Sequence, residues 1–163
     1  MLFRSDPSDA NLQLLKEAIQ YAGEHGAIFV VAAGNESLDM DKLLVNDPLY
    51  PAGFQGLNNM IVVAASDQKG DRAYFSNYGE NYVSVAAPGD EIISTIPGGS
   101  WESMSGTSMA TPLVAGAVAR GLSGKLSMGE AIRKIQSTSN PATSWQGKVK
   151  AGGVIDLTKF LAE

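Results

Sequence analysis

Apolar residues recur every three or four positions between residues 12 and 22, which predicts a helix with one buried face. The preceding segment is typical of a helix start, with Asp6 as the N-cap and Pro7 in the first helical position. Gly26 predicts the end of this helix. We therefore expect a first helix with one apolar face against a core.

Residues 27–33 form a continuous apolar run that is rich in β-branched side chains and too short for most helices. Residues 60–65 repeat this pattern, and residues 82–87 show a weaker version of it. Such runs are typical of strands buried on both faces, as in a parallel sheet covered by helices. A helix followed by buried strands predicts an α/β fold with about three parallel strands.

The rest of the chain alternates loops, a hairpin and helices. Residues 37–59 are loop-like because they are rich in proline, glycine and asparagine. Residues 91–96 and 100–104 predict a hairpin around Pro-Gly-Gly. Residues 108–120 are small and apolar on all sides, which predicts a buried helix. An amphipathic helix is expected over residues 128–137, and a short helix over residues 157–161.

The composition narrows the class of protein. With 163 residues, of which 44% are apolar, the chain suits one domain with a real core. A net charge of −5 argues against nucleic acid as a partner. There is no cysteine for disulfides or thiolate metal sites, and no run approaches the ~18 apolar residues of a membrane span. Residues 1–6 do not form a signal peptide, and the sequence assigns no compartment.

The sharpest local feature is the segment of residues 106–112, Gly-Thr-Ser-Met-Ala-Thr-Pro. Ser108 would begin a buried helix, where free backbone N–H groups and the helix dipole favour negative charge. Gly106 would let a substrate backbone come close. Such a serine suits nucleophilic catalysis with a stabilised oxyanion, but a serine at this position also serves as an ordinary N-cap.

Asn35 follows the apolar run of residues 27–33, at the carboxyl end of a predicted strand. Sites in open α/β sheets gather at these ends, and a side-chain amide there can donate to an oxyanion. Asn35 can equally be a plain turn residue, since it follows Gly34.

Taken together, these segments resemble the subtilisin-like serine proteases, from about Asp9 to the C-terminus. Residues 106–112 and the following Val-Ala-Gly resemble the family's nucleophile motif, and residues 32–35, Ala-Ala-Gly-Asn, resemble its oxyanion motif. Residues 50–52, Tyr-Pro-Ala, are similar to its specificity-pocket loop. Two further family segments are matched in order and spacing by residues 75–79, Phe-Ser-Asn-Tyr-Gly, and 85–89, Val-Ala-Ala-Pro-Gly.

The resemblance implies a role for each matching residue. Ser108 would be the nucleophile, and the Asn35 side chain and the Ser108 backbone N–H would form the oxyanion hole. The resemblance therefore predicts that the Ser108 hydroxyl and the Asn35 side chain lie close together, within roughly 10 Å in the folded chain. Tyr50-Pro51 is a candidate cis peptide in the pocket wall, because cis bonds are essentially confined to X-Pro. The implied substrate-binding residues are Ala32, Ala33, Gly34, Tyr50, Pro51, Gly106 and Thr107.

The departures from the family pattern concern the rest of the catalytic triad. The chain has neither the Asp-x-Gly nor the His-Gly-Thr motif, and residues 1–5 do not reproduce the family's substrate-pairing strand. Leu113 stands where many members have a second, noncatalytic histidine. The single histidine, His25, precedes the predicted strand and should lie ~20 Å or more from the oxyanion site. It therefore cannot replace the missing base.

No metal or other cofactor is implied. Family members often bind calcium, but the loop carboxylates Asp67, Asp71 and Asp90 lack the spacing of a calcium loop. The expected fold is the C-terminal half of a three-layer α/β sandwich with a mainly parallel sheet. Residues 1–163 would form a single partial peptidase domain without the aspartate- and histidine-bearing front half.

Two functions stay open for such a chain. The first is a serine endopeptidase that works through an acyl-enzyme and is inactive as this chain alone. The second is a noncatalytic pseudo-peptidase that acts as a binding or assembly module. The expected partners are a peptide or protein substrate of the parent enzyme, and either a second copy or a complementary N-terminal half. By resemblance, such a parent would be compatible with an extracellular location.

Overall fold

The computed structural model describes residues 3–4, 6, 8–43 and 49–162. Helix α1 spans Ala10–Glu24, and its N-cap is Asp9, whose carboxylate accepts a hydrogen bond from the Asn11 N–H. The prediction of Asp6 as the cap is therefore wrong: the Asp6 carboxylate accepts from the Ser8 N–H and hydroxyl instead. Pro7 lies outside the described residues. The helix ends at the predicted place, just before a glycine with a positive φ of 86°.

The main sheet has the strand order β2-β4-β5-β9-β8. Its parallel strands are β2 (Phe29–Ala32), β4 (Met60–Ser66), β5 (Val85–Pro88) and β9 (Gly153–Val154), and β8 (Asn140–Pro141) pairs antiparallel with β9. The predicted α/β class with a mainly parallel sheet is confirmed. The two-residue strands β8 and β9 were not predicted because they are too short to carry a hydrophobic pattern.

Two smaller sheets flank the main one. Strand β1 (Phe3–Arg4) pairs antiparallel with β3 (Leu49–Tyr50). The predicted hairpin is present as β6 (Ile92–Ile96) and β7 (Ser100–Met104), with φ of 92° and 79° at the two glycines of its turn. The expected loop of residues 37–59 is partly regular, because it holds α2 (Met40–Leu43) and β3. Pro48, one basis for that expectation, lies outside the described residues.

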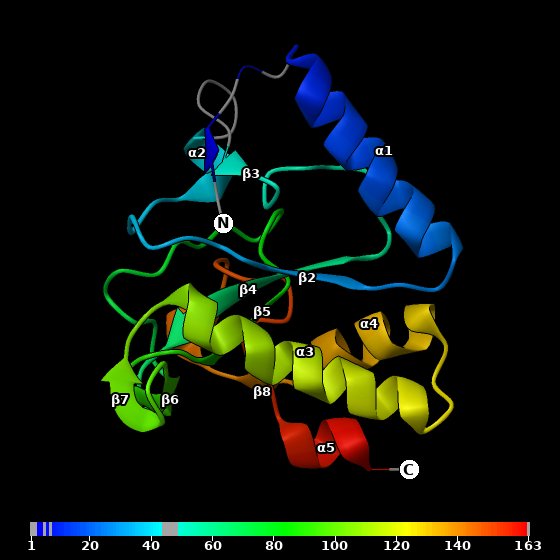
Figure 1. The fold of residues 1–163 in the computed structure, drawn as a ribbon. Coiled ribbons are helices and arrows are strands. Elements are labelled where there is room, and N and C mark those ends of the chain that lie inside the picture. The colour runs from blue at the N-terminus through cyan, green and yellow to red at the C-terminus, as the bar shows by residue number, and fades with distance from the viewer. Residues whose placement is uncertain (1–2, 5, 7, 44–48, 163) are drawn as a thin grey trace.

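Alternate residues of β4 enter two separate cores. Ile61, Val63 and Ala65 pack on the side of α3 (Thr107–Ser123), α4 (Met128–Thr138) and α5 (Leu157–Leu161). Val62 and Ala64 pack on the other side, against residues that include Trp145 of the 3₁₀ turn η1 (Thr143–Trp145). Figure 1 shows the sheet between α1 above and α3, α4 and α5 below, which gives three layers.

Helix α3 is not buried on all sides, contrary to the sequence prediction. Its inner face packs on β2, β4 and β5, whereas Pro112, Leu113, Gly116 and Ala119 are exposed. Strand β2 is the edge of the sheet, and within the described residues it pairs with β4 alone. One side of the molecule thus combines a small, apolar helix face with a strand whose outer edge pairs with none of the described residues. None of the described helices has the length and apolar character that crossing a membrane requires.

Candidate active site

The site begins at the turn that follows β2. Gly34 has a φ of 105°, a conformation that favours glycine, and its N–H donates to the Thr107 hydroxyl at 3.1 Å. This bond ties the end of β2 to the first residue of α3. The turn therefore carries Asn35 directly to the start of the helix that holds Ser108.

The orientation of the Asn35 carboxamide is fixed by Thr107. The oxygen Oδ1 accepts hydrogen bonds from the Thr107 N–H and from the Thr107 hydroxyl, each at 2.9 Å. The nitrogen Nδ2 donates to no group among the described residues, and a Cβ built on Gly106 would lie 3.4 Å from it. With Oδ1 engaged, Nδ2 is left as a free donor beside the Gly106 backbone.

Ser108 lies in the first turn of α3, and its side chain is exposed. Within the part of the chain that the structure describes, neither its N–H nor its hydroxyl makes a hydrogen bond. A helix of 17 residues has a partial positive charge at this end. The structure thus brings Ser108 and Asn35 to one corner, because Thr107, the neighbour of Ser108, bonds to Asn35. Asn35 Nδ2, the Ser108 N–H and the Ser108 hydroxyl have no partner there among the described residues.

The start of α3 is set by a close contact with the sheet. The Gly106 N–H donates to the Gly89 carbonyl at 2.8 Å. A Cβ at Gly89 would meet the Ala65 Cβ at 2.7 Å and the Gly106 carbonyl oxygen at 2.9 Å, distances that real Cβ atoms do not adopt. Only glycine allows this approach, which gives the 85–89 segment a physical role in placing the start of α3 and with it Ser108.

A cavity of about 310 Å³ opens beside Ser108. It runs along the exposed edge of β2, and its other walls are Pro51 and Thr111. Of the predicted substrate-binding residues, Ala32 and Pro51 line it. The others are buried and are not part of its lining: Ala33, Gly34, Tyr50, Gly106 and Thr107. Ala33 packs in the core and Thr107 holds Asn35, so any part they take in binding would be indirect.

The Tyr50–Pro51 peptide bond is cis, as the sequence predicted. The Tyr50 ring lies 4.7 Å from the Phe54 ring, and burial raises the pKa of its phenol. The Tyr50 side chain is buried in the core, and Pro51 is the residue of the pair that lines the cavity.

His25 is far from this corner in the fold. It is the C-cap residue of α1, its Nδ1 lies 2.8 Å from the Tyr21 carbonyl, and its ring lies 4.2 Å from the Tyr21 ring. It precedes β2, whereas Asn35 follows β2, so the length of the strand separates them. The one histidine of the chain therefore does not lie beside Ser108.

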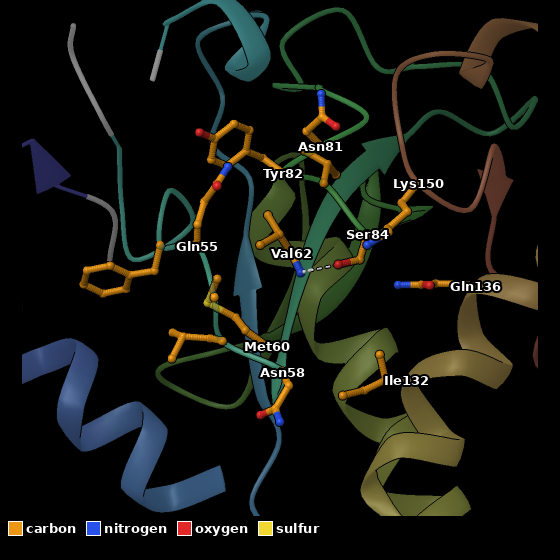
Figure 2. A pocket seen from close by; sticks show the side chains of 14 residues that line it. Gln55, Asn58, Met60, Val62, Asn81, Tyr82, Ser84, Ile132, Gln136 and Lys150 are labelled. Carbon is orange, nitrogen blue, oxygen red and sulfur yellow. Dashed lines mark hydrogen bonds between the residues drawn. The ribbon is translucent and has the colours of Figure 1, made fainter. Parts of the chain in front are cut away.

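A different cavity, of about 460 Å³, lies at the amino-terminal ends of β4 and β5 (Figure 2). Met60, Ser84 and, from α4, Ile132 and Gln136 contribute to its walls. The Ser84 hydroxyl accepts a hydrogen bond from the Val62 N–H at 3.1 Å, so it helps to hold the strands together. Lys150 is the one charged side chain among the described residues that line this cavity. This cavity lies at the opposite end of the strands from the Ser108 corner, so the two are separate.

No group of three or more histidine, cysteine, aspartate or glutamate side chains in the described part of the chain is arranged to hold a metal ion. Asp67, one of the loop carboxylates, accepts hydrogen bonds from the Lys69 and Asp71 N–H groups and so shapes its own loop.

Sequence reasoning missed several residues that shape the site. Asn77 is buried, and it makes hydrogen bonds on both sides of Asn35. Thr111 and the outer surface of β2 line the cavity. The available signal was a polar residue inside a segment already matched to the family, residues 75–79, but the direction of its side chain is a tertiary property.

The sequence matches the model of the subtilase family over residues 4–147. Thermitase of Thermoactinomyces vulgaris is 45% identical over 102 residues, which cover 63% of this chain and 33% of thermitase. A thermophilic serine proteinase of Bacillus sp. strain AK1 is 42% identical over 111 residues, which cover 68% of this chain and 25% of that protein. The chain therefore spans a third or less of the length of these relatives.

Solved structures give the same result for the fold. A chain of the subtilase cytotoxin SubAB assembly superposes with a TM-score of 0.78 at 26% identity, over 97% of this chain and 55% of that one. The epidermin leader peptide processing serine protease of Staphylococcus aureus gives a TM-score of 0.83 at 25% identity, over 99% of this chain and 48% of that one. With the family model matched over most of its length, this chain belongs to the subtilase family.

Proposed function

We propose that this chain is the nucleophile- and oxyanion-bearing part of a serine endopeptidase. The observation that carries the proposal is the corner at which two free N–H donors, Asn35 Nδ2 and the Ser108 N–H, lie beside the exposed Ser108 hydroxyl. Acyl transfer needs these elements together, because negative charge develops on the carbonyl oxygen as the nucleophile adds to the carbonyl carbon.

In the proposed reaction the Ser108 oxygen attacks the carbonyl carbon of a peptide bond while a base accepts the hydroxyl proton. The carbonyl oxygen of the tetrahedral intermediate accepts hydrogen bonds from Asn35 Nδ2 and the Ser108 N–H. Collapse of the intermediate, with protonation of the leaving amine, gives an acyl-enzyme that water then hydrolyses. The cavity beside Ser108 has no charged lining residue, which suits a preference for apolar substrate side chains or a broad specificity.

The base is the missing component, so we expect the chain alone to be inactive. A serine hydroxyl is a weak nucleophile until a base takes its proton. In subtilisin, a member of this family, loss of the histidine alone lowers kcat by about 10⁶-fold. The oxyanion hole and substrate binding still give a rate enhancement of ~10³–10⁴-fold over the uncatalysed reaction in water. A complementary front half with Asp-x-Gly and His-Gly-Thr motifs would supply the base. The proposed reaction uses no metal ion or cofactor.

The test uses a fluorogenic peptide and a serine-directed phosphonate, on the chain alone and on the chain mixed with a subtilase front half. We expect no useful turnover alone, and both turnover and labelling of Ser108 in the mixture. Ser108→Ala should abolish both in the mixture. Turnover by the pure chain that disappears in Ser108→Ala would show that a base has been overlooked.

The alternative function is a noncatalytic binding or assembly module. The observation that favours it is the absence, among the described residues, of any group that engages the Ser108 hydroxyl. A mixture in which the front half binds tightly, but in which Ser108 is neither labelled nor active, would favour this alternative.

A further inference from the structure

The geometry points to Asn77 as the residue that positions the oxyanion donor Asn35. Asn77 is not among the residues proposed to touch the substrate, and it lies in the segment between β4 and β5. The inference rests on the proposed function, because it assigns to Asn77 a task that matters only if Asn35 stabilises an oxyanion.

The Asn77 carboxamide makes hydrogen bonds to residues on both sides of Asn35. Its Oδ1 accepts from the Glu36 N–H at 3.1 Å and from the Leu38 N–H at 2.8 Å. Its Nδ2 donates to the Ala33 carbonyl at 2.9 Å and to Glu36 Oε2 at 2.6 Å. One side chain therefore holds the backbone two residues before the donor and the backbone that follows it.

Backbone bonds strengthen this clamp. The Asn77 N–H donates to the Gly34 carbonyl at 3.0 Å, and the Ser37 N–H donates to the Phe75 carbonyl at 2.7 Å. Asn77 itself is 1% exposed, so these bonds are shielded from water. The adjacent Ser76 hydroxyl accepts from the Ala65 N–H at 2.9 Å, which anchors the clamp to the central strand β4.

Asn35 needs such a support because packing does not hold it. Asn35, Glu36 and Ser37 are all exposed, so hydrogen bonds rather than buried contacts define the turn. A donor aimed at a transition state must be held to within a fraction of an ångström, since its value lies in being oriented in advance. An asparagine is suited to the clamp because a single carboxamide both donates and accepts; aspartate cannot donate when ionised, and alanine does neither.

Asn59 offers a matched control. It is also 1% exposed, and its Nδ2 donates to the Ile19 carbonyl at 2.9 Å and the Ala27 carbonyl at 3.2 Å. It therefore joins α1 to the segment before β2, at the end of the strand away from Asn35. Asn59→Ala and Asn77→Ala both remove a buried amide clamp, but only Asn77→Ala removes the clamp around the donor.

The first measurement is the amide hydrogen exchange rate of Thr107 in the full 163-residue chain, without any front half. The Thr107 N–H donates to Asn35 Oδ1 and makes no contact with Asn77, so its protection reports the place of Asn35. We expect Asn77→Ala to speed this exchange by about tenfold or more through local opening, relative to Asn59→Ala compared at equal global stability. Equal Thr107 exchange in the two variants would overturn the inference, whether or not the chain has any enzymatic activity.

The second measurement compares two ligands of the same peptide sequence, a peptidyl boronic acid and the corresponding peptide carboxylate. The Ser108 oxygen adds to boron and its proton passes to water, which gives a tetrahedral, anionic adduct that needs the oxyanion donors. We expect Asn77→Ala to weaken boronate binding by about tenfold or more, short of the 10²–10³ effect on kcat of removing a donor outright. Binding of the carboxylate should be unchanged, because it does not need the aligned donor.

The milder variant Asn77→Asp covers the case in which Asn77→Ala does not fold. It keeps the acceptor for the Glu36 and Leu38 N–H groups but opposes two carboxylates, so it should weaken boronate binding. Adding Glu36→Gln restores a donor–acceptor pair and should recover part of the affinity; no recovery would count against the clamp. If the wild-type chain binds no boronate, the proposed function fails, and the Thr107 exchange still decides the role of Asn77.

Discussion

The two faces of α3 have similar side chains but different surroundings. The inner face consists of small and apolar residues that are nearly inaccessible, among them Ala110, Val114 and Gly121. The outer face is also small and apolar, yet Pro112, Gly116 and Ala119 are exposed, and a Cβ at Gly116 would meet nothing within 4 Å. A helix that is apolar on all sides is normally covered on all sides. Helix α3 therefore has the composition of a central helix although one of its faces is open.

The largest expected effect of this difference is self-association. The open face of α3 adjoins the unpaired edge of β2, and exposed edges and apolar patches promote pairing. We expect a dimer with a dissociation constant in the micromolar range or tighter, equivalent to about −8 kcal/mol. Light scattering over a range of concentrations measures it.

Ala119→Glu would place a charge on the open face and should weaken this dimer by about tenfold or more. Ala162→Glu, at an exposed position near the C-terminus, is the matched control and should leave the mass unchanged. A stable monomer well above micromolar concentration would contradict the prediction.

The next effect is on the stability of the fold and distinguishes neighbouring positions on the two faces. Val114 is 0% exposed and Leu113 is 37% exposed. Val114→Ala removes two buried methyl groups and leaves a cavity, so it should lower the free energy of unfolding by about 1.5–3 kcal/mol. Leu113→Ala should lower it by less than about 1 kcal/mol. Urea denaturation at low protein concentration, to keep association out of the measurement, would show whether the ranking holds.

A pair of glycine substitutions should differ in sign. A Cβ at Gly121 would lie 3.0 Å from the Phe160 ring and 3.1 Å from the Leu126 side chain, so Gly121→Ala should destabilise the chain by roughly 1 kcal/mol. At Gly116 the space is open, and alanine is the better helix former, so Gly116→Ala should stabilise it by about 0.5–1 kcal/mol. The same methyl group should weaken the dimer if close packing occurs there. Thermal unfolding of both variants measures the difference. Equal shifts of the two melting temperatures would contradict the prediction.

The smallest effect is a pH dependence at Glu130, an exposed residue in the first turn of α4. Glu130 accepts hydrogen bonds from the Ser127 hydroxyl and N–H, and these bonds lower the pKa of its carboxyl. The ionised form is therefore favoured in the folded state. Its stabilising contribution is present above the ordinary pKa of about 4.3 and is lost as the pH falls through the lower, folded value. Glu130→Gln should reduce the melting temperature slightly at pH 7, and the difference from wild type should shrink at acidic pH.

The elements that were predicted from the sequence are those with a strong local pattern. The runs that became β2 and β4 are continuously apolar, and the weaker run that became β5 is interrupted by Ser84. The hairpin has glycines at the two positions where φ is positive. Strand β9 depends instead on a neighbour: a Cβ at Gly153 would lie 1.8 Å from the Asn140 carbonyl oxygen, so its pairing with β8 is a tertiary constraint. No local pattern could have predicted it.

The site was predictable in part for the same reason. Ser108 and Asn35 lie in recognisable segments, and the sequence predicted that they would lie close together. The bonds that bring them together run between Gly34, Thr107 and Asn77, residues far apart in the chain, and so could not be predicted from spacing. The open face of α3 was predicted wrongly because composition does not say which side of a helix has a neighbour.

The hydrogen bonds from Thr107 to Asn35 have a kinetic consequence. They hold the oxyanion donor beside Ser108 before any base-bearing partner arrives, so docking would need no rearrangement of this corner. At concentrations low enough to keep the chain monomeric, the appearance of activity after mixing with a front half should then follow a single second-order phase, with a rate proportional to the partner's concentration. A rate that levels off at high concentration would instead reveal a slow conformational step, which a corner built in advance does not require.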